Sequence, residues 1–139
     1  MPSGKTVKKV LFVCVGNTCR SQIAEGFANA LGRGKIEVRS AGTSATGHVN
    51  KATIEAMKER GIDISAQSSK QLTDEMIDWA DVVVTLGCCS AGMLCPADFK
   101  GKKTDWKIED PLGRPPEVLS RVRDEIERKV KELLAEDGA

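Results

Sequence analysis

The sequence predicts an α/β protein: an open, doubly wound sheet of about four parallel strands with helices on both faces. Two observations lead to this prediction. Residues 81–86 (Asp-Val-Val-Val-Thr-Leu) include a continuous apolar run, which is typical of a strand buried on both faces of a parallel sheet. Residues 10–38 contain an apolar run, a segment with helical spacing and a short alternating segment, which is the order of a right-handed βαβ unit.

Apolar periodicity defines the first half of the chain. Residues 10–15 form a short apolar run that we expect to be a strand, and apolar residues at helical intervals predict a helix over residues 21–31. Residues 36–38 alternate and predict a second strand, whereas residues 40–44 (Ser-Ala-Gly-Thr-Ser) have the composition of a turn. A short loop must therefore join the first strand to the first helix.

Capping residues and prolines define the second half. Asn50 can cap a helix, and Thr73, which two acidic residues follow, can cap another short one. Residues 87–114 are expected to be mostly irregular, with residues 106–108 as a candidate edge strand. The prolines at residues 115–116 open a last helix, in which apolar residues recur at intervals of three and four.

Length and charge narrow the class of protein. The chain has 139 residues, which suits one domain over residues 1–139, and we expect a monomer. Lysine and arginine number 21 against 20 acidic residues, so we expect neither a nucleic acid nor a membrane as partner. The first apolar run is too short for a signal peptide, and no stretch is long enough to span a membrane. A cytoplasmic protein is expected.

Five cysteines are an odd number in a chain of this size without an export signal, so a structural disulfide framework is not expected. Cys14 lies where the first strand ends, and the helix begins a few residues later. The unpaired N–H groups and dipole of a helix start make a nest for a tetrahedral oxyanion, and the same field favours a reactive thiolate at Cys14. The candidate oxyanion-binding residues are Val15, Gly16, Asn17, Thr18, Cys19, Arg20 and Ser21.

Individual residues of this segment suit the same chemistry. Gly16 carries no Cβ, and Asn17 tolerates the left-handed conformation that a tight loop requires. Arg20 can contact two oxygens of an anion at once, which a lysine cannot do. Ser21 is placed to donate a hydrogen bond to the Cys14 thiolate. A buried, inert cysteine at a strand end is the alternative interpretation.

The segment Cys14-Val-Gly-Asn-Thr-Cys-Arg-Ser21 resembles the phosphate-binding loop of the low-molecular-weight protein tyrosine phosphatases and of the arsenate reductases built on the same fold. A cysteine and an arginine at this spacing are a weak signal alone, but here they follow a strand and open a helix. The resemblance covers nearly the whole chain. It implies that Asp110, which precedes Pro111, is the general acid, with Glu109 as the local alternative.

A second cysteine cluster distinguishes two activities. The segment Gly87-Cys-Cys-Ser-Ala-Gly-Met-Leu-Cys-Pro96 resembles the redox loop of thioredoxin-coupled arsenate reductases, in which two cysteines seven residues apart follow the same strand. Cys88 and Cys95 have this separation. The adjacent Cys89 departs from the pattern, and whether Cys88 or Cys89 attacks Cys14 stays open, with spacing in favour of Cys88. The resemblance implies that Cys95 resolves the intermediate to a disulfide, which thioredoxin or a similar dithiol protein reduces.

Arsenate reduction is therefore the predicted activity, with catalytic residues Cys14, Arg20, Asp110, Cys88, Cys89 and Cys95. Gln22, where the phosphatases typically have proline, and the absence of tyrosine favour this activity over hydrolysis of phosphotyrosine through a phosphocysteine. That phosphatase is the second hypothesis, and its first step is shared, because phosphate and arsenate are nearly isosteric. A non-enzymatic module that binds anions or senses redox state is the third.

No metal or cofactor is predicted. A zinc site of cysteines with His48 would lack both Cys-x2-Cys spacing and a second histidine, so His48 is expected to serve in loop hydrogen bonds. Some members of the reductase family bind potassium beside the loop, and Asn17, Glu25 and Ser40 match that pattern. Lys70 stands where an acidic ligand is expected, and its ammonium can replace the cation. Cys19 is expected to pack, although a Cys14–Cys19 disulfide stays open.

Overall fold

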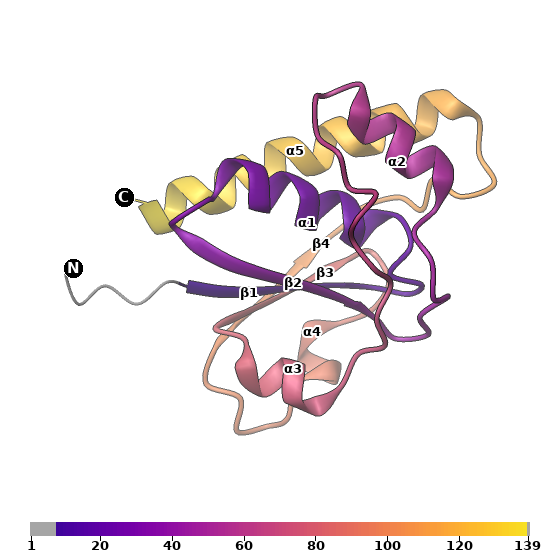
Figure 1. Ribbon diagram of the computed structural model, residues 1–139. Coiled ribbons are helices and arrows are strands. Elements are labelled where there is room, and N and C mark those ends of the chain that lie inside the picture. The colour runs from indigo at the N-terminus through magenta and orange to yellow at the C-terminus, as the bar shows by residue number, and fades with distance from the viewer. Residues whose placement is uncertain (1–7, 139) are drawn as a thin grey trace.

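A sheet of four parallel strands forms the centre of the molecule, and the computed structural model describes it within residues 8–138. The strands are β1 (Lys8–Cys14), β2 (Ile36–Gly42), β3 (Val82–Leu86) and β4 (Lys102–Trp106). Their order across the sheet is β2-β1-β3-β4 (Figure 1). The chain thus passes from β1 to the strand on one side of it, and then crosses back to β3 on the other side. This is the predicted open, doubly wound sheet, in which a ligand site is expected at the carboxyl ends of the central strands.

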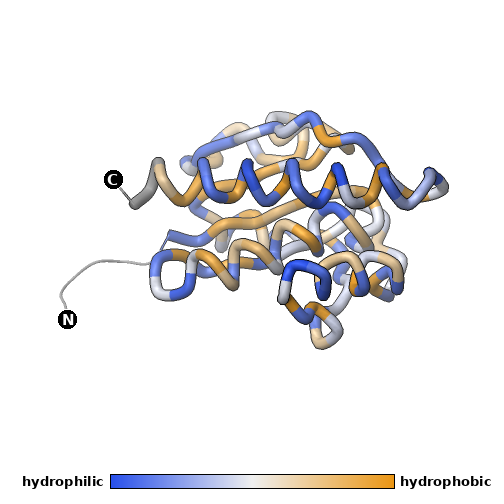
Figure 2. The backbone as a smooth tube through the Cα atoms, turned by 90° about the horizontal axis from the view of Figure 1, so that it is seen from above, coloured by the Kyte–Doolittle hydropathy of each residue, from blue (hydrophilic) through white to orange (hydrophobic). Residues whose placement is uncertain are grey.

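Helices cover both faces of the sheet, as predicted. On the upper face in Figure 1 lie α1 (Arg20–Leu31), α2 (Lys51–Lys58) and α5 (Pro116–Gly138), and on the lower face lie α3 (Asp74–Trp79) and α4 (Ala91–Leu94). Helix α5 alternates between hydrophobic and hydrophilic residues along its length, as Figure 2 shows. Its apolar stripe can therefore pack inward while its charged face meets solvent.

Alternation along β1 divides the core in two. Val10, Phe12 and Cys14 belong to the cluster under α1 and α5, whereas Leu11 and Val13 belong to the cluster on the other face. All five of these side chains are at most 3% exposed. A strand that is buried on both faces is held rigidly, so Cys14 at its carboxyl end has a fixed position.

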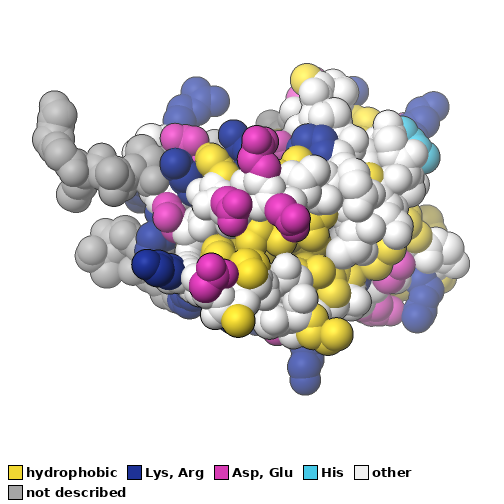
Figure 3. Space-filling model, turned by 90° about the horizontal axis from the view of Figure 1, so that it is seen from below, with side chains coloured by type: hydrophobic (Ala, Val, Ile, Leu, Met, Phe, Trp, Pro, Cys, Tyr) yellow, Lys and Arg dark blue, Asp and Glu magenta, His cyan; other side chains and the backbone are white. Residues whose placement is uncertain are grey.

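The lower face is covered less completely than the upper one. Met76, Leu94 and Phe99 are only partly buried against its core cluster. Figure 3 views the molecule from this side and shows apolar side chains at the surface with several acidic side chains beside them. Within residues 8–138, no helix is both long enough and apolar enough to cross a membrane.

The two predicted helix caps are confirmed. The Asn50 side chain accepts a hydrogen bond from the N–H of Thr53 at 3.1 Å, and the Thr73 hydroxyl accepts one from the N–H of Met76 at 3.3 Å. Each bond satisfies an N–H group that has no partner within its helix.

Two element assignments were wrong. Strand β2 continues to Gly42 instead of turning at residue 40, because its buried end consists of small residues that resemble a turn in sequence. The edge strand is Lys102–Trp106 instead of residues 106–108, since an edge strand with polar, exposed residues carries no apolar signal. Residues 87–114 are mostly irregular, as expected, apart from β4 and the single turn of α4.

Candidate active site

Residues 15–19 join β1 to α1 in a loop at the carboxyl edge of the sheet. The carbonyls of Cys14, Val15 and Thr18 accept hydrogen bonds from the N–H groups of Thr43, Ser44 and Asn50, respectively, at 2.8–3.0 Å. In a trans peptide unit the N–H points away from the C=O. With the carbonyls bound from the outside, the N–H groups that follow them are directed to the inside of the loop, as an oxyanion nest requires.

Cys14 lies at the floor of this loop and is 3% exposed. Its Sγ is 2.9 Å from Oγ of Ser21, which in turn accepts a hydrogen bond from Nδ2 of Asn17 at 2.7 Å. Because an amide nitrogen only donates, the hydroxyl proton of Ser21 is available for the sulfur. The predicted hydrogen bond from Ser21 to the Cys14 thiolate is therefore compatible with every contact of both groups in the structure.

Asn17 holds the loop together and is fully buried. Its φ of 49° lies in the left-handed region, as predicted for an asparagine here. Nδ2 also donates to Oγ of Ser40 at 2.9 Å, and Oδ1 accepts from the N–H of Lys70 at 2.7 Å. One side chain thus ties the anion loop to β2 and to the segment before α3.

Gln22 makes a second tie, which explains the glutamine at this position. Nε2 donates to the carbonyls of Asn17 and Ser68 at 2.9 Å, and Oε1 accepts from Nε2 of Gln67 at 2.7 Å. A proline at residue 22 could make none of these bonds. Gln22 is 0% exposed, so its amide acts as an internal brace of the loop.

Lys70 occupies the neighbourhood that the resemblance associates with a cation. Ser40 donates a short hydrogen bond to Glu25, and Nζ of Lys70 lies 3.8 Å from Oε1 of Glu25 while donating to the carbonyl of Ser68 at 2.6 Å. The ammonium therefore balances the charge of Glu25 behind the anion loop.

Arg20 is the first residue of α1 and is 6% exposed. Nη1 donates to the carbonyl of Leu86 at 2.7 Å and to that of Ile108 at 3.0 Å. Two carbonyls thereby fix the guanidinium plane and leave Nε and Nη2 for a two-point contact with an oxyanion.

Gly87 makes room for this arrangement, and sequence reasoning missed its role. Its φ is +84°, and a Cβ built there would lie 2.1 Å from the Ile108 carbonyl oxygen and 2.8 Å from Nη1 of Arg20. Only glycine satisfies both the conformation and the space. The signal in the sequence was the glycine that directly follows the central apolar run and precedes Cys88.

Asp110 lines the same cavity as Cys14. Oδ2 is 3.9 Å from Nη2 of Arg20, and Oδ1 accepts a hydrogen bond from the N–H of Leu112 at 3.0 Å. Its side chain is 56% exposed, so it can exchange protons with solvent. Glu109, the alternative acid, is paired instead with Arg114 and Arg121.

These groups enclose a cavity of about 190 Å³. Its lining contains seven predicted site residues together with Ser44, Thr46 and Leu112, which were not predicted: Cys14, Val15, Gly16, Thr18, Cys19, Arg20, Ser44, Thr46, Asp110 and Leu112. Asn17 and Ser21 do not line the cavity; their side chains make the hydrogen bonds that hold the loop. Among the described residues, none that lines the cavity is aromatic. Trp106 packs in the core against Phe12, and the Arg39 guanidinium lies over the ring of Trp79.

Cys19 is a packing residue, as expected. It is 2% exposed, and Oγ1 of Thr53 donates a hydrogen bond to its sulfur at 3.1 Å. Burial raises the pKa of the Cys19 thiol to about 11, and the Thr53 hydroxyl opposes this shift only in part. Cys14 and Cys19 are both free thiols in the structure.

The three cysteines of residues 87–96 lie outside the cavity, on the lower side of the sheet. Cys88 and Cys89 are half-buried and joined by a disulfide, whereas Cys95 is a free thiol that is 6% exposed. Sγ of Cys88 is 3.8 Å from the carbonyl oxygen of Val13, the residue before Cys14. The loop thus approaches the floor of the anion site from below.

No group of three or more histidine, cysteine or acidic side chains is placed to hold a metal within residues 8–138. The backbone carbonyl of His48 accepts hydrogen bonds from the hydroxyls of Thr18 and Thr46 at 2.6 and 3.0 Å.

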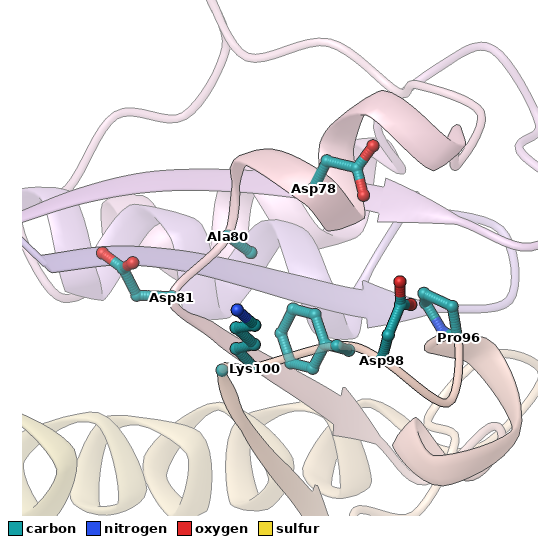
Figure 4. Close-up of a pocket in the computed structure, with 8 residues that line it drawn as sticks. Asp78, Ala80, Asp81, Pro96, Asp98 and Lys100 are labelled. Atoms are coloured by element: carbon teal, nitrogen blue, oxygen red, sulfur yellow. The ribbon is translucent and has the colours of Figure 1, made fainter.

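A larger cavity of about 370 Å³ opens near the start of β3 and β4 (Figure 4). Residues of α3 and of the loop before β4 line it, among them Asp78, Asp98 and Lys100. None of the predicted catalytic residues reaches it. Size therefore does not identify the functional site here.

The fold brings a cysteine, an arginine and an aspartate together around one cavity at the carboxyl end of β1. The family model described as low molecular weight phosphotyrosine protein phosphatase matches residues 9–137. The chain belongs to this family.

Three relatives show what the chain is similar to. It is 43% identical to the glutaredoxin arsenate reductase of Synechocystis sp., over 93% of this chain and 98% of that protein. An arsenate reductase solved in its phosphate-binding state has a TM-score of 0.79 at 40% identity, over 94% of this chain and 99% of its own. A thioredoxin-dependent arsenate reductase from Corynebacterium glutamicum has a TM-score of 0.81 at 34% identity, over 98% of this chain and 64% of its own.

Proposed function

We propose that this protein reduces arsenate to arsenite with its own thiols and is then regenerated by a dithiol protein such as thioredoxin. The observation that carries the proposal is the position of the second cysteine cluster. Cys88 lies against the carbonyl of Val13, one residue from the candidate nucleophile. A phosphatase needs no such group, whereas a reductase must supply two electrons. The similarity to proteins named arsenate reductases supports the proposal.

The first step is attack of the Cys14 thiolate on arsenic. The loop N–H groups and the free nitrogens of Arg20 hold the oxygens of arsenate, and Ser21 donates its hydrogen bond to the sulfur. A sulfur–arsenic bond forms while one oxygen leaves. Asp110 protonates the departing oxygen, which avoids expulsion of a bare anion.

The second step transfers the electrons. The Cys88 thiolate attacks Sγ of Cys14, a disulfide forms, and the pair of electrons in the sulfur–arsenic bond leaves with arsenic as arsenite. Two thiols are oxidised and arsenic(V) becomes arsenic(III), so the electrons balance. Cys95 ends the relay in a disulfide on the loop, which an external dithiol reduces by exchange. A reducing cytoplasm would support this cycle.

Hydrolysis of phosphate esters is the second candidate, and the family match favours it. It would use Cys14, Arg20 and Asp110 in the same roles, with water attacking a phosphocysteine. The cavity argues against an aryl phosphate, because none of the described residues that line it has an aromatic ring to stack on a substrate.

The test compares both activities in one preparation. Arsenite production is measured with thioredoxin, its reductase and NADPH, and hydrolysis of p-nitrophenyl phosphate is measured with the same protein. We expect sustained arsenite production, which Cys14→Ser and Cys88→Ser should each abolish. Any residual hydrolysis of p-nitrophenyl phosphate should be lost in Cys14→Ser and retained in Cys88→Ser. Arsenate turnover that survives Ala substitution of Cys88, Cys89 and Cys95 in turn would overturn the relay. Oxyanion binding without either turnover would indicate a binding module.

A further inference from the structure

The loop after β3 carries three thiols, although a relay from Cys14 to an exposed disulfide needs only two. Cys89 is the unexplained one. Its place in the chain, next to Cys88, and the bond that joins the two in the structure give it a chemical role. This inference rests on the proposed arsenate reduction and adds a step to it.

Cys88 lies close to the anion site. Its sulfur lies 3.8 Å from the carbonyl oxygen of Val13, at the carboxyl end of β1. When Cys88 has attacked Cys14, the Cys14–Cys88 disulfide needs a thiol close to Cys88 to break it. Cys89 is the residue whose sulfur is bonded to that of Cys88 in the structure, so its sulfur reaches Cys88 with the loop in this conformation.

Cys95 is not accessible in this conformation. It is 6% exposed, packs in the lower core cluster with Leu11 and Val13, and follows directly after α4. That helix turn is held from β4, because Oδ1 of Asp105 accepts a hydrogen bond from the N–H of Ala91 at 2.9 Å. Burial also raises the pKa of the Cys95 thiol, which keeps it protonated and unreactive. Cys95 must leave this packing before it can attack a disulfide.

We propose that Cys89 is the intermediate thiol of the relay. The Cys89 thiolate attacks Sγ of Cys88, the Cys88–Cys89 bond forms, and the Cys14–Cys88 bond breaks with release of the Cys14 thiolate. No electrons are gained or lost in this exchange, since one disulfide replaces another. When α4 opens, the Cys95 thiolate attacks one sulfur of the Cys88–Cys89 bond. A disulfide to Cys95 forms, the other sulfur leaves as a thiolate, and the relay ends. The disulfide in the structure is then the state between the anion site and the exposed product.

The consequence is that Cys14 is regenerated before α4 opens. The anion site can bind its next oxyanion while the disulfide is held between Cys88 and Cys89. Cys89 therefore regenerates the Cys14 thiolate, and Cys95 forms the disulfide that the external dithiol reduces.

The test is a single turnover with the matched variants Cys89→Ser and Cys95→Ser, each fully reduced and mixed with arsenate without added reductant. Samples are quenched with an alkylating agent over time, and mass spectrometry identifies the free thiols and the disulfides. Cys95→Ser should release arsenite, recover a free Cys14 thiol at the wild-type rate and stop at Cys88–Cys89. Cys89→Ser should release arsenite but retain Cys14–Cys88 at least tenfold longer than wild type.

The proposal is overturned if Cys89→Ser frees Cys14 at the wild-type rate, or if Cys95→Ser accumulates Cys14–Cys88. Phosphate affinity of both variants, measured by calorimetry, verifies that the anion loop is intact, and Cys89→Ala repeats the result with a second side chain. Failure of the proposed function looks different, because wild-type protein would then release no arsenite at all, and this outcome overturns both proposals.

Discussion

Arg20 is buried, and its orientation is set by the backbone of two other segments. The carbonyls of Leu86 and Ile108 accept hydrogen bonds from Nη1. The conformational entropy of this long side chain is therefore lost on folding and not on binding of an anion. The sequence predicted the arginine and its contact with the anion, because the spacing from Cys14 places it at the helix start. The two carbonyls come from residues 66 and 88 positions away and could not be identified from a local pattern.

Arg20→Lys should weaken phosphate binding and lower arsenate turnover on the order of 10²-fold, because an ammonium cannot bond both carbonyls and still contact two oxygens. Calorimetry with phosphate and arsenite release measure the two effects. Arg123→Lys is the control, since Arg123 is also buried and donates to the Ala56 carbonyl, but lies on α5 away from the cavity. Equal losses of phosphate affinity in both variants would contradict this role.

Cys19 makes a pH-dependent contribution to stability. Its pKa is raised from 9.0 to about 11 in the folded protein, chiefly by burial. Below pH 9 the thiol is protonated in both states. Between pH 9 and about pH 11 the thiol ionises in the unfolded chain but not in the folded protein. Ionisation lowers the free energy of the unfolded state, so the free energy of unfolding falls as the pH rises.

The difference in free energy of unfolding between wild type and Cys19→Ala should therefore shrink as the pH rises through this interval. Urea unfolding of the two proteins at a series of pH values measures it, and the ionisation of lysines cancels in the difference. A difference that is constant or grows with pH would show that the Cys19 thiol ionises as readily in the folded protein as in the unfolded chain.

At the scale of elements, the two central strands and the capped helices were predictable because local signals and global fold agree there. The end of β2 was not, since Gly42 is required by tertiary packing: a Cβ there would lie 2.5 Å from the Val15 carbonyl oxygen. Strand β4 and helix α4 escaped prediction because both are short and are held by distant partners. The Asp105 carboxylate links them by accepting from the Thr85 hydroxyl and from the N–H of Ala91.

Asp105→Ala should release α4 and increase the rate at which iodoacetamide modifies Cys95 by about tenfold, the effect of losing a hydrogen bond to a charged group at an exposed site. Removal of the Asp105 charge also lowers the Cys95 pKa and acts in the same direction. Peptide mapping after timed alkylation gives the rate. Asp98→Ala is the control, since it removes a lower-face carboxylate that makes no bond to α4. An unchanged Cys95 rate in Asp105→Ala would contradict the role of Asp105.

At the scale of the molecule, the active site exists only because separate segments converge at one edge of the sheet. Gly87 shows this most directly, because it follows β3 and leaves space for Arg20 from α1 and for the carbonyl of Ile108. The sequence predicted the convergence, since a parallel sheet brings its strand ends together. It did not predict that Gly87 provides the space, because the atoms that a Cβ there would meet belong to segments far away in the sequence.

Gly87→Ala should weaken phosphate binding at least about tenfold and also destabilise the fold, because the new methyl group displaces Arg20 and strains a backbone at φ +84°. Gly61→Ala is the matched control: its φ is +76°, and a Cβ there meets nothing within 4 Å. Both variants should lose stability in urea unfolding, but only Gly87→Ala should lose phosphate affinity. Similar affinity in the two would contradict the role of Gly87 at the site.

The central claim is that the electrons for arsenate reduction come from the thiols of this chain. The most direct measurement is the amount of arsenite released when fully reduced protein is mixed with arsenate and no other reductant is present. We predict one arsenite per chain with the loss of two of the five thiols. Release of no arsenite with all five thiols retained, while p-nitrophenyl phosphate is hydrolysed, would contradict the claim and identify a phosphatase.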